Sequence, residues 1–358
     1  MKRAYDQSEY IKLYTRVRED IVKGVYPFGT KLPSKRTMAE KEGISTITVE
    51  HAYALLCDEG YAEARERSGY FVIFHTTDGF FSPPQKQSFQ KGSKPSEERG
   101  ALPEFPFSVL SQTMRRVISE YGEGILERSP NEGRPELREA VCRYLLAGKG
   151  IAAAPSQIII GAGSEYLYTL TAELFGRYRR YAIEYPSYKK IEQVYRAAAL
   201  NYEKLPLGND GIETHALWKS SADVLHISPY RSFPSGVTAS ASKKHEYLRW
   251  ASEGERYIIE DDFESEFSLS EKPVETLFAH SQKDNVIYLN TFSMTVSPSL
   301  RIGYMVLPCS LLSEFREKVG FYSCTVSTYM QLVLAELLDN GDLTRHINRV
   351  RRRKRREN

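Results

Sequence analysis

The residues of this chain best suited to chemistry lie in two short stretches of its second half. The first, GAGS at Gly161–Ser164, places a hydroxyl where a helix is expected to begin, and such a turn offers backbone amides to an anion. The second, TFSMTVSPSLRIGY at Thr291–Tyr304, supplies the hydroxyl of Ser293 and the guanidinium of Arg301. Hydroxyl and guanidinium groups such as these are suited to bind a phosphate or another anion. Without such partners, a turn of this kind is often only a tight turn.

Two further features have a chemical and a plain interpretation. Met294 follows Ser293, and its thioether has no nucleophilic nitrogen. Judged by its type alone, Met294 is a packing residue. The acidic residues of the run EDDFESEF form either an exposed surface or a hard-metal site, and a metal would need several oxygens to converge. These residues are Glu260, Asp261, Asp262, Glu264 and Glu266.

The first 75 residues carry the pattern of three helices. A first helix is expected over Glu9–Lys23, where apolar residues recur at helical spacing. Ser34 and Ser45 are each placed to cap a shorter helix, and Gly43 makes the turn between the two. Two short helices joined through a glycine turn are typical of a helix-turn-helix, which sends its second helix into the major groove of DNA.

Two alternating segments follow the helices. Tyr61–Ala64 and Gly69–Phe74 are expected to form a hairpin around the turn Arg65–Ser68, which would be the wing of a winged helix-turn-helix. Residues 1–76 contain 12 Lys and Arg against 11 Asp and Glu. This near-neutral balance is weak for a DNA-binding module, because phosphate neutralisation supplies much of the affinity. A winged helix that contacts protein is therefore the alternative.

The ordered motifs L-P-S-x-R, G-I-S, T-V, L-x-x-E/D-G-Y and S-G-Y-F-V resemble the DNA-binding domain of GntR-type bacterial regulators. The resemblance implies that this module binds double-stranded DNA. Many members of that family have arginine where Thr46 and Glu50 stand here, and Glu50 can accept from a cytosine amino group or repel phosphate. The residues that the resemblance places at the DNA are Lys35, Arg36, Ser45, Thr46, Thr48, Arg65, Arg67 and Gly69.

After residue 75 the composition changes twice. Residues 76–104 are rich in Pro, Gln, Lys and Ser without hydrophobic periodicity, which predicts a flexible linker. From residue 105 onward, short apolar runs alternate with helical segments, which indicates an α/β domain with a mainly parallel sheet. Examples of the expected strands are Gln157–Gly161, Arg180–Glu184, Val224–Ile227, Tyr257–Glu260, Val286–Asn290 and Arg301–Leu307.

Over residues 105–350 the chain resembles a fold-type I pyridoxal-phosphate (PLP) aminotransferase. Together with the first module it resembles the MocR subgroup of GntR regulators. The motifs that carry this are GRPELREAVCRYL, GAGSEYL, EYPSY, SPYRSFPSG, EDDFESEF and TFSMTVSPSLRIGY. The resemblance predicts a winged helix-turn-helix over residues 1–75, a linker over 76–104 and an aminotransferase-like domain for effector sensing or dimerisation over 105–358. Most of the C-terminal subdomain of that fold is expected to be missing.

The MocR resemblance also implies a cofactor site. Gly163, Ser164, Ser293 and Arg301 should meet the phosphate, Asp261 should pair with the pyridine nitrogen, and Tyr188 should line the pocket. Met294 stands where the family has the lysine that bonds covalently to the cofactor, and Phe263 replaces a tyrosine. PLP is therefore expected to bind non-covalently and weakly if at all, and no catalytic residue and no metal ligand are assigned.

Several functions follow from these patterns. The first is a homodimeric transcriptional regulator that binds an operator, with a catalytically silent domain that senses an unknown small molecule. The second is a PLP-dependent enzyme that acts on preformed cofactor adducts, against which Met294 counts. The third is a scaffold that does not bind DNA, and the fourth is a non-functional truncated relative.

Composition is consistent with a cytoplasmic protein. The chain has 358 residues with a hydrophobic share of 41%, no apolar run long enough to cross a membrane, and four scattered cysteines without C-x-x-C spacing. Eight of the 12 residues from Arg345 to Arg356 are Lys or Arg. This tail is either a nucleic-acid patch or the end of a solvated helix, since Leu343, Ile347 and Val350 recur at helical spacing.

Overall fold

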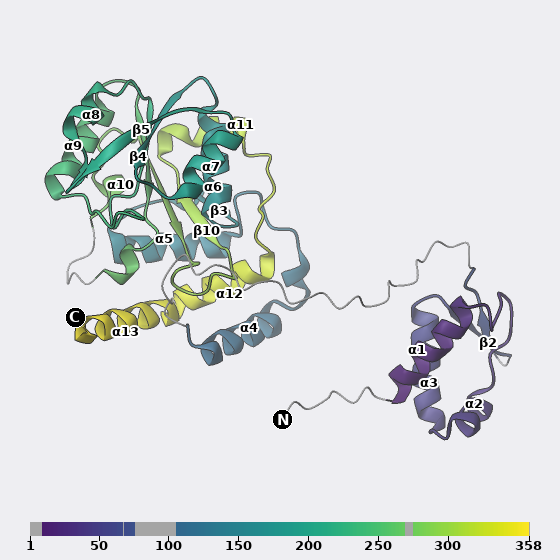
Figure 1. The fold of residues 1–358 in the computed structure, drawn as a ribbon. Helices are drawn as coiled ribbons and strands as arrows, with labels where there is room; N and C mark the ends of the chain where they lie inside the picture. Colours follow the sequence, from purple (N-terminus) through teal and green to yellow (C-terminus); the bar gives the residue numbers. More distant parts are fainter. Residues whose placement is uncertain (1–8, 67, 76–104, 269–274, 358) are drawn as a thin grey trace. The chain divides into compact units, whose positions relative to one another are not determined.

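The computed structural model describes residues 9–66, 68–75, 105–268 and 275–357, and the chain divides into two units, Met1–Ser96 and Glu97–Asn358 (Figure 1). The expected linker over residues 76–104 lies outside the described residues. None of the helices in the described ranges combines the length and the apolar character that a bilayer crossing requires. The elements of the first unit are α1 (Glu9–Val22), α2 (Lys35–Glu42), α3 (Thr46–Asp58), β1 (Ala62–Arg65) and β2 (Gly69–Val72).

The first unit is held together by the apolar faces of its helices. α1 and α3 pack against each other through side chains with helical spacing, and each fully buried one contributes about 1.5–3 kcal/mol. The Tyr53 hydroxyl donates to the carbonyl oxygen of Pro33 at 3.0 Å, which ties α3 to the segment before α2. The buried side chains of α1 and α3 are Leu13, Tyr14, Val17, Ile21, Val49, Ala52, Tyr53 and Leu56.

The hairpin of the first unit is anchored to the helices through its second strand. β1 and β2 pair antiparallel from Ala62–Val72 to Arg65–Gly69, and Lys31 forms an isolated bridge to Phe71. The structure therefore confirms the expected hairpin but ends β1 at Arg65, which the sequence had placed in the turn. Arg65 is paired in the ladder because it sits opposite Gly69, whose φ of +112° suits glycine.

The second unit is built around an eight-stranded sheet in the order β3-β10-β9-β8-β7-β4-β5-β6. Strands β9, β8, β7, β4 and β5 are parallel neighbours, whereas β10 runs antiparallel to both β9 and β3, and β6 runs antiparallel to β5. This confirms the expected mainly parallel sheet. The strands are β3 (Ile158–Gly161), β4 (Arg180–Tyr185), β5 (Asn201–Gly208), β6 (Gly211–Ile212), β7 (Val224–Ile227), β8 (Tyr257–Asp261), β9 (Val286–Thr291) and β10 (Gly303–Val306).

Helices cover both faces of this sheet. Along β3, Ile158 and Ile160 point into one cluster of buried side chains and Ile159 into another, as the period of two in a strand requires. The strands therefore consist almost entirely of apolar residues. The α-helices are α4 (Phe107–Tyr121), α5 (Pro135–Lys149), α6 (Ser164–Phe175), α7 (Lys189–Ala197), α8 (Thr214–Lys219), α9 (Ala241–Ser252), α10 (Leu277–His280), α11 (Leu312–Lys318), α12 (Thr328–Asp339) and α13 (Asp342–Glu357). Short 3₁₀ helices are η1 (Gly122–Leu126), η2 (Pro155–Gln157), η3 (Ser265–Phe267) and η4 (Cys309–Leu311).

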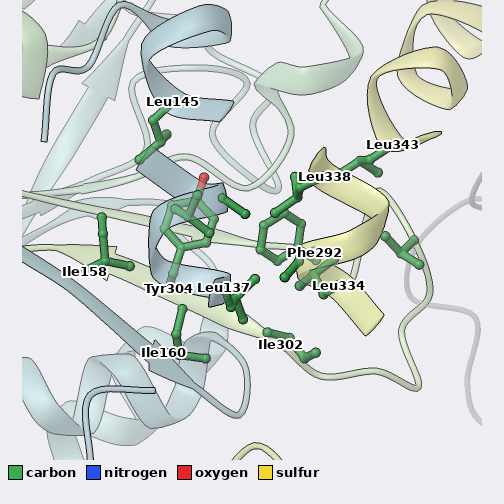
Figure 2. Close-up of a cluster of buried hydrophobic side chains, with 14 of the residues drawn as sticks. Leu137, Leu145, Ile158, Ile160, Phe292, Ile302, Tyr304, Leu334, Leu338 and Leu343 are labelled. Atoms are coloured by element: carbon green, nitrogen blue, oxygen red, sulfur yellow. The ribbon is translucent and has the colours of Figure 1, made fainter. Parts of the chain in front are cut away.

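One cluster joins the sheet to the C-terminal helices (Figure 2). Leu137 and Leu145 of α5 face Tyr304 of β10, while Leu338 of α12 and Leu343 of α13 close the cluster from the other side. Phe292 and Ile302, at the two ends of the loop between β9 and β10, are buried in the same cluster. The loop that carries Ser293 and Met294 is thus anchored at both ends by buried side chains.

A buried ionic cluster lies beside this apolar core. The Lys149 ammonium at the end of α5 is 2.9 Å from Asp262 and 3.5 Å from Glu266, and the three side chains are 4–5% exposed. The Tyr288 hydroxyl donates to Asp262 at 2.8 Å. Lys149 holds the pKa of Asp262 below its usual range against the effect of burial, whereas burial raises the pKa of Glu266. Part of the acidic run is therefore buried around a lysine.

Replacing Lys149 with methionine is expected to lower the free energy of unfolding by about 3–5 kcal/mol at neutral pH, because it leaves a buried carboxylate unpaired. Asp262 has a lowered pKa in the folded protein, so its stabilisation is present above the ordinary carboxyl pKa and is lost as pH falls through the lowered value. The difference in the free energy of unfolding between the variant and the unmodified protein should therefore become smaller at acidic pH. Urea unfolding at neutral and acidic pH measures it, with the exposed Lys219→Met as control. An unchanged midpoint would contradict the prediction.

Candidate functional site

The N-terminal end of α3 is shaped to present polar side chains outward. The Thr48 backbone N–H donates to the Ser45 hydroxyl at 3.1 Å, so Ser45 caps the helix as expected, and the two hydroxyls lie 2.8 Å apart. This cap fixes the first turn and leaves Thr46 exposed. The positive end of the helix dipole at this terminus favours negative charge such as phosphate.

Lys35 of α2 and Glu50 of α3 are linked across the two helices. The Lys35 ammonium lies 2.8 Å from a Glu50 carboxylate oxygen, and both side chains are well exposed. The hydrogen bond with Glu50 raises the pKa of Lys35, and the same bond lowers the pKa of Glu50. Lys35, expected at the DNA, is therefore partly neutralised by a residue on the predicted recognition helix.

The remaining residues expected at DNA have different surroundings. Arg36 is exposed at the start of α2. Arg65 is held by Glu63, 2.6 Å away, and its guanidinium lies 4.4 Å from the centre of the Phe71 ring. Gly69 follows in β2, where a Cβ would lie 3.0 Å from the end of the Lys31 side chain. Arg67 lies outside the described residues.

The second group of candidate residues surrounds the start of α6. Gly163 has a φ of +86° and precedes Ser164, the first residue of the helix. A Cβ on Gly163 would lie 3.1 Å from the Arg301 guanidinium, so the turn and the arginine are neighbours. That guanidinium pairs with the Glu165 carboxylate at 2.7 Å, and Glu165 also lies in the first turn of α6.

Arg301 has a backbone φ of +47°, which is unusual for a residue with a side chain. The expected strand therefore begins at Gly303 rather than at Arg301. Such a conformation costs of order 1–3 kcal/mol and persists where surrounding structure imposes it, often at ligand sites. Here the Phe292 N–H donates to the Ile302 carbonyl at 2.8 Å, which fixes the position next to Arg301.

Ser293 is positioned by its neighbour in the same loop. The Thr291 hydroxyl donates to the Ser293 hydroxyl at 3.0 Å, and the Ser293 N–H donates back to the Thr291 hydroxyl oxygen at 3.2 Å. Met294 follows and is half-buried. The structure thus places Ser293 and Met294 in the loop that leads to Arg301, and Ser293 is engaged with Thr291.

Asp261, at the end of β8, belongs to a buried chain of polar side chains. The Tyr168 hydroxyl of α6 donates to Asp261, and His226 of β7 lies 4.0 Å from it. His226 shares a 2.8 Å hydrogen bond with the Tyr195 hydroxyl, and burial lowers the pKa of His226 to about 3. These contacts connect the end of β8 with α6 through Tyr168, and with β7 and α7 through His226 and Tyr195.

Tyr188 lies close to this group. It is the residue before α7, is half-buried, and packs edge-to-face against Phe233 with ring centres 6.2 Å apart. Phe263, two residues after β8, is buried. In the described ranges, no cluster of three or more His, Cys, Asp or Glu side chains has the arrangement of a metal site.

The structure therefore brings Gly163, Ser164, Asp261 and Arg301 to one end of α6. Backbone amides, a hydroxyl and a guanidinium suit a phosphate, and a buried carboxylate suits a ring nitrogen that carries a proton. These donors fit PLP as a non-covalent ligand. The half-buried Met294 supplies no amine, so they do not fit a covalent link. Glu165 would have to share Arg301 with any phosphate.

Sequence reasoning missed the residues behind Asp261. Tyr168 and His226 lie on α6 and β7, far from Asp261 in sequence. The sequence signal that could have suggested them is that each is a polar residue within an otherwise apolar, buried segment. The Lys149–Glu266 cluster was missed for the same reason, since 113 residues separate Lys149 from Asp262.

Comparison with known proteins divides the chain in the same order. A family described as bacterial regulatory proteins, gntR family, matches residues 9–72, and aminotransferase class I and II matches residues 103–357. The chain is 33% identical to the uncharacterized HTH-type transcriptional regulator YdeL of Bacillus subtilis over 98% of its length and 78% of the relative. It is 27% identical to the probable rhizopine catabolism regulatory protein MocR of Rhizobium meliloti, over 98% and 76%.

The second unit also resembles solved aminotransferases. An archaeal alanine:glyoxylate aminotransferase is similar with a TM-score of 0.63 and 22% identity, over 69% of this chain and 64% of that one. At this identity the similarity shows the fold. The chain thus spans a little under two thirds of the length of this enzyme.

Proposed function

The chain belongs to the MocR subgroup of the GntR family of transcriptional regulators, and on this premise we propose how its two units divide the work. Residues 1–75 bind a double-stranded operator, residues 76–104 form a linker, and residues 105–358 sense a small molecule and form a homodimer. The aminotransferase-like unit is catalytically silent. The protein acts in the cytoplasm, where the bacterial chromosome lies.

The observation that carries the DNA-binding role is the capped start of α3. Ser45 caps the first turn through Thr48, and Thr46 and Glu50 are exposed in the first two turns of α3. Glu50 also contacts Lys35 of α2. A helix presented in this way can lie in the major groove with its N-terminal side chains at base edges. The wing would add Arg65, Arg67 and Gly69 at the backbone or the minor groove.

For the second unit, we propose that PLP or a similar phosphorylated ring compound binds without a covalent bond. Gly163 and Ser164 would offer amides and a hydroxyl to the phosphate, with Arg301 and Ser293 beside them. Asp261 would meet the ring nitrogen and Tyr188 would line the site. The ion pair between Arg301 and Glu165 supports weak binding, because a phosphate competes with a carboxylate already in place.

The proposed lack of catalytic activity rests on Met294, since transamination needs a basic amine at the carbon that reacts. Bound PLP would supply an electron sink, and Met294 would bring no amine that moves a proton there. Homodimer formation is supported by apolar side chains at the surface of the second unit. Among these, Phe107, Leu126 and Phe321 are 77%, 82% and 67% exposed.

The test is a fluorescence-anisotropy titration of the full chain against the DNA upstream of its own gene, at two salt concentrations, with and without PLP. Tight binding that exceeds binding to a scrambled duplex and weakens steeply with salt is expected. A shift on adding PLP would support the sensing role. Equal affinity for the upstream and scrambled duplexes would contradict the proposal.

Glu50→Gln is expected to raise affinity for every duplex several-fold and to steepen the dependence of log K on log salt by about one, because it frees Lys35 for a phosphate. Selectivity at a contacted cytosine should fall at the same time, since glutamine prefers adenine. Anisotropy with a panel of duplexes measures both changes.

The matched control for this variant is Glu40→Gln, which removes the same charge from an exposed position on α2. If Glu50→Gln behaves like this control, the Lys35–Glu50 pair has no influence on DNA binding.

A further inference from the structure

The last helix of the described chain, α13 (Figure 1), is strongly basic in sequence. From Arg345 to Arg356 it contains eight Lys and Arg and no Asp or Glu. The proposed roles of the two units leave this helix unexplained, and charge of this density indicates a polyanionic partner.

Contacts on its inner side fix the rotation of α13. Leu343, Ile347 and Val350 are buried in the cluster shared with α5 and α12. The Arg351 guanidinium donates to the Glu266 carbonyl at 2.6 Å, and the Lys354 ammonium lies 5.1 Å from the centre of the Phe267 ring. The helix is therefore docked through one face, and the opposite face is set toward solvent.

The exposed face carries a row of arginines. Arg345, Arg349, Arg352 and Arg356 are exposed and follow one another at intervals of four, three and four residues, which places them in line on a helix. Arg345 pairs with Asp342 at 2.7 Å. Among the carboxylates whose side chains the structure describes, none forms an ion pair with Arg349, Arg352 or Arg356. The row, Arg345–Arg356, spans about 16 Å at 1.5 Å per residue.

A row of this length matches a nucleic-acid backbone, because about five phosphates of one DNA strand fall within the same distance along the helix axis. The buried apolar face argues against a membrane, since Ile347 and Val350 cannot be inserted into lipid while they pack on the core. The first module is nearly neutral, with 12 Lys and Arg against 11 Asp and Glu in residues 1–76. Its own charge therefore adds little affinity for phosphates, and a second basic surface would increase the affinity for DNA.

We propose that the arginine row of α13 binds the phosphate backbone of double-stranded DNA without regard to sequence. This proposal rests on the proposed function in one respect, namely that the polyanion bound by the arginine row is DNA. The row adds electrostatic affinity, while selectivity stays with the first unit.

The experiment compares the full chain with the triple variant Arg349→Gln, Arg352→Gln, Arg356→Gln by anisotropy on a long non-cognate duplex over a range of salt. Glutamine keeps the helix propensity of arginine, so the fold should be retained. The slope of log K against log salt is expected to fall by roughly 2–3, at about 0.9 per lost phosphate contact. The matched control removes three exposed charges elsewhere: Arg115→Gln, Arg177→Gln and Lys219→Gln.

A second variant with lysine at the three positions keeps the charge and should retain most of the DNA affinity. Circular dichroism of each variant establishes that the helices remain. The proposal is overturned if the triple glutamine variant of α13 has the same salt slope as the control variant with Arg115→Gln, Arg177→Gln and Lys219→Gln. It is also overturned if the α13 variant loses binding to phosphatidylserine vesicles while its DNA binding is unchanged. Failure of the proposed operator role is distinguishable, because it would abolish the preference for upstream DNA and leave the effect of the arginine row intact.

Discussion

After borohydride reduction and denaturation, the Met294→Lys variant is expected to carry PLP covalently, at about one cofactor per chain, where the unmodified chain carries none. Residue 294 lies in a loop clamped by Phe292 and Ile302, and Arg301 sits beside the Gly163 turn where the phosphate would bind. A lysine amine there can condense with the cofactor's aldehyde, which replaces the C=O bond by a C=N bond and releases water. The apparent affinity should rise at least about a hundredfold, which corresponds to roughly 2.7 kcal/mol.

Borohydride reduction followed by mass spectrometry of the denatured chain measures this gain. Met294→Arg is the matched control, because it adds a long cationic side chain that forms no such bond. An unlabelled but folded lysine variant would show that the site does not hold the ring, and would contradict the proposed non-covalent binding as well.

The second large effect concerns DNA. Replacing Arg36 and Thr46 together with alanine is expected to lower affinity for the upstream duplex by roughly ten- to a hundredfold, through one lost phosphate contact and one lost base contact. Both side chains are exposed, and the cap of α3 depends on Ser45 and Thr48 instead. The first unit should therefore stay folded.

Each single variant separates the two contributions. Arg36→Ala should weaken binding to all sequences and reduce the salt slope by about one, whereas Thr46→Ala should mainly reduce the preference for upstream DNA. Lys23→Ala removes one charge from the end of α1 and serves as control. If the double variant matched this control, the DNA-facing assignment of α3 would be wrong.

Local signals in the sequence predicted the first unit closely. Ser34 and Ser45 cap helices as expected, because a side-chain cap needs only residues three positions away. The expected helix Glu9–Lys23 is α1, which ends one residue earlier at Val22. The lysine–glutamate link between Lys35 and Glu50 was not foreseen, since it depends on how α2 and α3 cross.

In the second unit, apolar runs predicted the buried central strands but not β5 and β6. Asn201–Gly208 lies near the edge of the sheet and is mostly exposed or half-buried, so it lacks the apolar run of a buried strand. The convergence of Asp261, Tyr168 and His226 was equally inaccessible, because three different elements bring them together. The role of the acidic run stayed open in the sequence, and the structure shows that burial around Lys149 accounts for Asp262 and Glu266.

The pairing of β9 with β10 has a consequence for how such a protein can change over generations. Their register, from Gly303–Thr291 to Val306–Tyr288, is set by backbone partners on either side of the loop, and residue 294 takes no part in it. The same strand pairing can therefore carry either methionine or lysine at position 294. Codons for methionine and lysine can differ by a single base, so the two side chains are one base change apart at this position.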